Sequence, residues 1–75
     1  MVLLETTIGS KVKVMNLDQV HSLVRRRLGD LGVREGSVIS LRRIMPFGGP
    51  CTLEINGLWI AIRRKDAVSI VVGAC

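Results

Sequence analysis

Few side chains in this sequence could act as nucleophiles, bases or metal ligands. The chain has two cysteines, Cys51 and Cys75, a single histidine, His21, and six acidic residues. The cysteines form no CxxC pair, and together with one histidine they do not supply the three or four ligands of a protein zinc site. No serine or cysteine has the partners of a nucleophilic active site. The sequence therefore predicts no catalysis, no cofactor and no metal within one chain, and it leaves open a metal shared between chains.

With catalysis and a metal site within one chain excluded, the remaining chemical feature of the sequence is its positive charge, which can bind an acidic partner. Eleven lysine and arginine residues against six acidic ones give a formal net charge of +5. Such an excess favours an acidic partner, which could be nucleic acid, an anionic lipid surface or an acidic protein face. Proteins that bind single-stranded nucleic acid usually stack bases on several aromatic rings, and this chain offers only Phe47 and Trp59. Composition alone makes nucleic acid the less favoured partner.

Cellular location is inferred from the hydrophobic segments and the cysteines. No apolar run approaches the ~18 residues of a membrane helix, because the longest apolar stretch, 67–75, is short and interrupted. The N-terminus carries Glu5 and no basic segment of a signal peptide. Two scattered cysteines are best explained as free thiols, with Cys51 as a small core residue. We expect a single domain over residues 1–75 in the cytoplasm.

The first half of the chain predicts a strand followed by a helix. Residues 11–15 alternate polar and apolar, as in a half-buried strand. Asn16 or Asp18 can cap the helix, and Asn16 with Gln19 has the spacing of a capping box. Gly32 is expected to end the helix in a left-handed conformation. The apolar positions of the helix then form one stripe at helical spacing: Val20, Leu23, Val24, Leu28 and Leu31.

The second half predicts strands over 37–45, 51–55, 58–64 and 69–72. Asn56-Gly57 is a strong signal for a two-residue hairpin turn. That turn places six side chains on one buried face, together with Val12, Val14, Ile39 and Leu41: Cys51, Leu53, Ile55, Leu58, Ile60 and Ile62. Glu54 and Trp59 should pair on the other face. Five strands and one main helix after the first strand predict a mainly β protein, a small β-barrel whose closure would remove exposed sheet edges.

A series of short motifs in a fixed order resembles the FeoA family of bacterial ferrous iron transport. The marks span about Thr7 to Val72 and are the following: Arg27-Leu28, Leu31-Gly32-Val33, Glu35-Gly36, Pro46-Phe47-Gly48-x-Pro50, Asn56-Gly57, Ile62-Arg63, Asp66-Ala67 and Ile70-Val71-Val72. Gly49 and Met45 depart from the residues common in the family. The resemblance implies an SH3-like barrel with an inserted helix. The same barrel is similar to the C-terminal domain of iron- and manganese-dependent repressors.

The resemblance also implies a function and a partner. It implies a non-catalytic accessory protein that binds the cytosolic part of the membrane GTPase permease known as ferrous iron transport protein B. By elimination, we expect a partner-binding patch that combines aromatic anchors and arginines: Arg25, Arg26, Phe47, Trp59 and Arg63. A basic nucleic-acid-binding barrel, or a stand-alone relative of the repressor barrel, is the alternative. The sequence is also compatible with a homo-oligomer.

Overall fold

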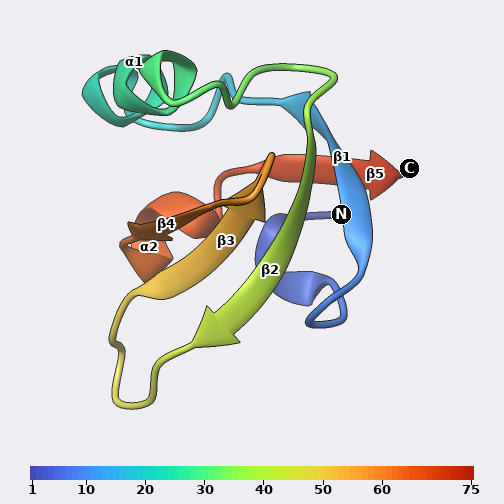
Figure 1. Ribbon diagram of the computed structural model, residues 1–75. Coiled ribbons are helices and arrows are strands. Elements are labelled where there is room, and N and C mark those ends of the chain that lie inside the picture. Colours follow the sequence, from blue (N-terminus) through green and yellow to red (C-terminus); the bar gives the residue numbers. More distant parts are fainter.

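A five-stranded antiparallel sheet, strongly curved into a barrel, forms most of the computed structural model, which describes residues 1–75 (Figure 1). The strands are as follows: β1 (Lys11–Asn16), β2 (Val38–Ile44), β3 (Cys51–Ile55), β4 (Leu58–Ile62) and β5 (Val71–Ala74). Their order across the sheet is β4-β3-β2-β1-β5. The single long helix, α1 (Ser22–Asp30), follows β1, as predicted. A 3₁₀ turn, η1 (Leu3–Glu5), and a short helix, α2 (Arg64–Ala67), complete the fold.

The β3–β4 hairpin has the predicted register. Asn56 and Gly57 both have positive φ, 51° and 80°, as the turn residues of a twisted two-residue hairpin require. Leu53 consequently pairs with Ile60, and Glu54 pairs with Trp59. Five of the six predicted hairpin positions are buried, and so are the four predicted residues of β1 and β2.

Leu58 is the exception on the hairpin, and its predicted burial was wrong. It pairs with buried Ile55 in the predicted register, but it is 46% exposed. Leu58 is the first residue of β4, and β4 is an edge strand, so no neighbouring strand lies on its outer side. Cross-strand pairing thus decides on which face of the sheet a side chain lies, but it does not by itself bury that side chain.

The end of α1 confirms the role predicted for Gly32, which has φ +95°. The Val33 amide donates to the Leu28 carbonyl at 2.8 Å, and the Gly32 amide donates to the Gly29 carbonyl at 3.0 Å. These are the two bonds of a Schellman motif, and Leu28 and Val33 supply its apolar contact because both are buried. A side chain on Gly29 would meet nothing within 4 Å, so close packing does not explain that glycine.

The start of α1 and its apolar stripe differ from the prediction. The helix begins at Ser22, where His21 is the N-cap and its Nδ1 accepts from the Leu23 amide at 3.2 Å. The predicted Asn16 capping box does not form, because the Asn16 side chain accepts instead from the Asp18 amide. Leu23 is 70% exposed. At 100° per residue it lies about 140° around the axis from buried Leu28, so it faces away from the barrel.

The last part of the chain also differs in detail. The strand β4 ends at Ile62, before the predicted end at 64, and residues 64–67 form the short helix α2, which was not predicted. The final strand, β5, begins at Val71 and continues to Ala74. The ladder does not close, because β4 and β5 remain the two ends of the sheet and are not paired with each other. The predicted removal of sheet edges was therefore wrong, and the outer edge of β4 is free of any strand.

Candidate functional site

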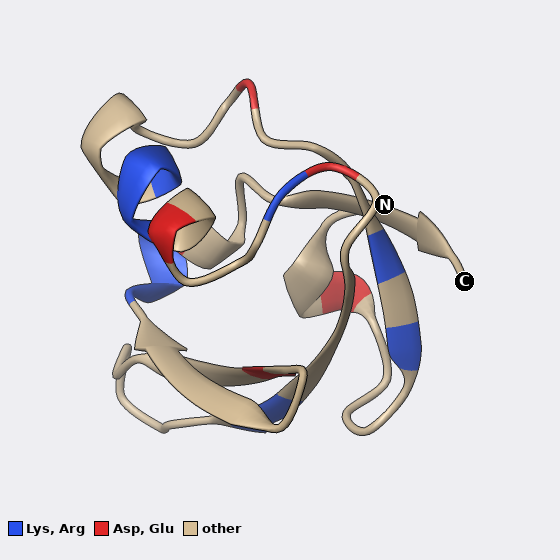
Figure 2. Ribbon diagram, turned by 45° about the horizontal axis from the view of Figure 1, so that its top comes forward, with Lys and Arg blue, Asp and Glu red and all other residues tan.

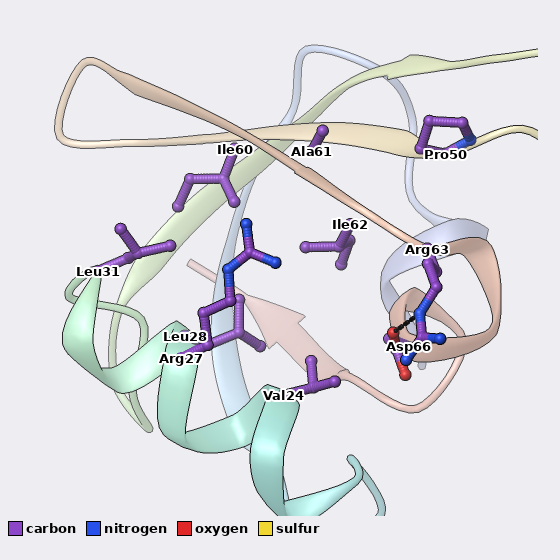
Figure 3. Close-up of a pocket in the computed structure, with 10 residues that line it drawn as sticks. All are labelled: Val24, Arg27, Leu28, Leu31, Pro50, Ile60, Ala61, Ile62, Arg63 and Asp66. Carbon is purple, nitrogen blue, oxygen red and sulfur yellow. Dashed lines mark hydrogen bonds and ion pairs between the residues drawn. The ribbon is translucent and has the colours of Figure 1, made fainter.

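The clearest concave site is a groove between α1 and the free edge of β4, with a volume of about 260 Å³ (Figure 3). Its apolar walls come from α1 on one side and from β4 on the other, as the following residues show: Val24, Leu28, Leu31, Pro50, Ile60, Ala61 and Ile62. On the α1 side, Leu28 is buried in the core and Val24 packs against it.

Three charged residues complete the lining: Arg27, Arg63 and Asp66. Arg63 Nε donates to Asp66 Oδ2 at 3.0 Å, and the Asp66 side chain is 8% exposed while that of Arg63 is 64% exposed. Arg27 takes part in neither of the two ion pairs of the protein. Figure 3 shows its side chain extending from α1 across the groove toward β4. The groove therefore combines an apolar floor with one uncompensated positive charge.

Trp59 lies on the outward face of β4, in a second surface cluster. Trp59 is 60% exposed, and the guanidinium carbon of Arg42 lies 6.0 Å from the centroid of its ring. Arg42 Nε is 2.7 Å from Glu54 Oε1, on the strand between them. A β-bulge in β2 between Leu41 and Arg43 accompanies this arrangement, and bulges commonly redirect a side chain. Trp59 is thus an exposed aromatic residue beside a paired arginine.

Phe47 is held fully in solvent at the tip of the loop between β2 and β3. It has φ 59°, an uncommon conformation for a non-glycine residue, and Gly48 follows with φ 75°. The Gly49 amide donates to the Pro46 carbonyl at 3.1 Å, which closes the loop on itself. Phe47 therefore covers no part of the barrel.

The base of this loop is tied to α2. Arg64 Nη2 donates to the Met45 carbonyl at 2.8 Å. Basic residues of α2 and its N-cap also line a wider, more open hollow beside the loop, made of the following residues: Gly48, Pro50, Arg63, Arg64 and Lys65. Arg63 and Pro50 border both this hollow and the groove, so the two features share an edge.

The five predicted partner-binding residues do not gather in one cavity. Arg25 and Arg26 are exposed on α1, and the loop that carries Phe47 lies at the opposite end of the molecule (Figure 1). Figure 2 shows basic residues on α1 and along β1. Of the five, only Arg63 lines the groove. A shared role for them in partner binding stays a prediction.

Of the residues that line the groove, sequence reasoning assigned only Arg63 to a site, and it did not assign the charged Arg27 and Asp66 or Pro50. The signal that could have identified Arg27 was its position in the sequence beside the predicted apolar stripe. An arginine at the border of an apolar face often lays its stem along the core and keeps its charge at the rim.

The structure groups no side chains for metal binding or nucleophilic catalysis. No three histidine, cysteine, aspartate or glutamate side chains lie together as metal ligands. Cys51 is fully buried and free, and Cys75 is free and exposed. Burial raises the pKa of the Cys51 thiol, and the positive charge of Arg64 offsets part of that rise. A thiol held neutral in this way is a poor nucleophile. No helix in the structure has the length and hydrophobicity needed to cross a membrane.

Comparison with known proteins identifies the family. The chain matches the FeoA domain family over residues 1–74. A FeoA protein from Chlorobium tepidum is 34% identical, with a TM-score of 0.89 over 99% of this chain and 70% of its own. A FeoA-like protein from Clostridium acetobutylicum is also 34% identical, with a TM-score of 0.78 over 99% of this chain and 85% of its own.

A third solved relative connects the fold to a named class. It is FeoA from Stenotrophomonas maltophilia in complex with zinc, described as a prokaryotic SH3 domain protein. It is 25% identical, with a TM-score of 0.79 over 97% of this chain and 89% of its own. No curated protein sequence matches the chain. The family match and the shared SH3-like barrel show that this chain belongs to the FeoA family of ferrous iron transport accessory proteins.

Proposed function

We propose that this chain is a cytosolic, non-catalytic accessory protein that binds the cytosolic part of the membrane GTPase of ferrous iron transport. There it would modulate the assembly or the nucleotide turnover of the permease. The observation that carries the proposal is the family match over residues 1–74, with the same fold in relatives that are 34% identical.

The surface of the molecule supports a binding role. Two aromatic side chains, Phe47 and Trp59, are exposed. Aromatic residues and arginines are enriched among residues that dominate protein–protein binding energy. Arg25 and Arg26 add exposed positive charge on α1, which would attract an acidic partner and speed its association.

The test is direct binding between this chain and the purified GTPase domain of the permease from the same organism. We expect Arg26→Glu and Trp59→Ala each to weaken binding. Arg34→Glu and Leu58→Ala are matched controls, because Arg34 and Leu58 are also exposed but lie outside the proposed patch. Circular dichroism checks that each variant is folded. Absence of binding by the wild-type chain would overturn the proposal.

The alternative function predicts a different salt dependence. A nucleic-acid-binding barrel would be retained on heparin or single-stranded DNA, with affinity falling steeply as salt rises. In the structure Phe47 and Trp59 lie on different elements, and neither stacks with the other in one groove. If this chain still binds the GTPase domain at high salt, the result would favour the proposed function over this alternative.

A further inference from the structure

We infer that the groove between α1 and β4 binds an extended acidic peptide segment, which adds to the free edge of β4 as a further strand. The inference rests on the proposed function in one respect, namely that the segment belongs to a protein partner. It differs in naming a site and a mode of binding. Three observations carry it: the unpaired edge, the shape of the groove and the placement of its charges.

The edge of β4 presents main-chain hydrogen-bonding groups that nothing in the molecule uses. In a hairpin with a two-residue turn, the pair flanking the turn exchanges hydrogen bonds and the pairs then alternate. Ile55–Leu58, Leu53–Ile60 and Cys51–Ile62 are therefore the bonded pairs. The N–H and C=O groups of Trp59 and Ala61 point away from β3, and no other backbone hydrogen bond in the structure involves them.

The groove runs along this same edge. Ala61 is exposed and lines it, between the inward-facing side chains of Ile60 and Ile62. In an antiparallel pair, directly opposed residues point to the same face. A segment whose backbone pairs with Ala61 would thus place its two neighbouring side chains beside Ile60 and Ile62, in the apolar groove. Strand addition of this kind takes affinity from main-chain bonds and specificity from alternate side chains.

The charges on the groove determine the chemistry of the segment. Arg27 extends from α1 into the groove toward β4 (Figure 3), and it has no ion pair. Arg63 follows β4 directly, and its side chain is 64% exposed although Asp66 is its partner. Lysine or arginine in the segment would be repelled by both arginines, whereas carboxylates would gain charge-assisted hydrogen bonds. The occupant is therefore an alternating apolar and acidic segment.

Nuclear magnetic resonance on the full ¹⁵N-labelled chain can test this with acetyl-Glu-Val-Glu-Val-Glu-amide as the probe. We expect amide shifts confined to β4 around Ala61 and to the end of α1 around Arg27. The matched peptide acetyl-Lys-Val-Lys-Val-Lys-amide should not bind. Methylating the backbone nitrogen of the central glutamate should abolish binding, because that N–H would pair with the edge.

Two variants test the two features separately. Arg27→Glu should weaken the glutamate peptide by about tenfold or more, as expected for a lost charge-assisted hydrogen bond. Arg34→Glu, a charge reversal away from the groove, should leave its affinity unchanged. Ala61→Pro removes the free edge N–H without removing an internal hydrogen bond, and it should abolish binding while the dispersed spectrum of a folded protein persists. The methylated peptide makes the same test if Ala61→Pro does not fold.

The outcomes separate this inference from the proposed function. No binding of the glutamate peptide at millimolar concentration, equal binding of the lysine peptide, or shifts mapped elsewhere would overturn the inference. So would a thymidine oligonucleotide that binds the same residues more tightly than the peptide. If the chain still binds the GTPase domain in that case, the proposed function stands and only the groove is excluded. If the peptide binds but the GTPase domain does not, the groove is supported and the partner is wrong.

Discussion

The β3–β4 hairpin and α1 face the same core, but they are buried to different degrees. Cys51 and Leu53 on the hairpin are both 0% exposed. On α1 only Leu28 is buried, while Leu23 is 70% exposed. The difference arises because the curved sheet surrounds the hairpin residues, whereas a single helix touches the barrel along one line. We conclude that the barrel contributes most of the buried core, whereas the looser packing of the helix leaves the groove beside it.

The largest expected effect is on the barrel side of this comparison. Leu53→Ala should lower the free energy of unfolding by about 2–5 kcal/mol, because it leaves a cavity in a fully packed core. That is a large fraction of the total for a chain this short, given about 0.05–0.15 kcal/mol per residue. Urea denaturation followed by circular dichroism measures it. A loss below about 0.5 kcal/mol would mean that the barrel does not dominate stability.

The next effect concerns the end of α1. Substituting alanine for two glycines there should change the free energy of unfolding in opposite directions. Gly32→Ala places a side chain at φ +95° and should cost about 1–2 kcal/mol. Gly29→Ala should instead stabilise by up to about 1 kcal/mol, because the position is helical and open. The same denaturation experiment measures both. A Gly32→Ala variant more stable than the wild type would contradict the Schellman motif at the end of α1.

A smaller effect should appear in the pH dependence of stability. The pKa of Cys51 is raised in the folded state above its ordinary value of 9.0. Above that pH the unfolded chain loses the thiol proton first, so the free energy of unfolding should fall as pH rises. The slope from one proton is at most about 1.4 kcal/mol per pH unit. Denaturation of Cys51→Ala between pH 8 and 10 should show a shallower fall, while Cys75→Ala, at an exposed thiol, should follow the wild type.

The smallest effect sharpens the contrast with Leu53. Leu23→Ala is the same chemical change on the exposed face of α1, and it should alter the free energy of unfolding by no more than about 0.5 kcal/mol. Thermal denaturation of the two leucine variants side by side gives the comparison. A loss at Leu23 as large as the loss at Leu53 would show that this face of α1 is covered in solution, for example by a second copy of the chain.

Local signals in the sequence predicted most of the barrel. Asn56-Gly57 fixed the register of β3 and β4, because a two-residue turn with positive φ permits only one pairing. Gly32 marked the end of α1 for a similar reason, since only glycine adopts that conformation without strain. The expected patch of Arg25, Arg26, Phe47, Trp59 and Arg63 had no such local signal, and it rested on residue type alone.

The sequence by itself thus determined the order of the five strands and the long helix, the hairpin register and the family, all of which depend on contacts between near neighbours or on ordered motifs. Only the tertiary structure decided which way α1 is turned, that Leu58 lies at an uncovered edge, and that Arg27 faces Ala61 across a groove. The physical reason is that burial and edge pairing depend on which distant element lies opposite. Residues 27 and 61 are far apart in the chain, and packing of the helix against the barrel brings them together.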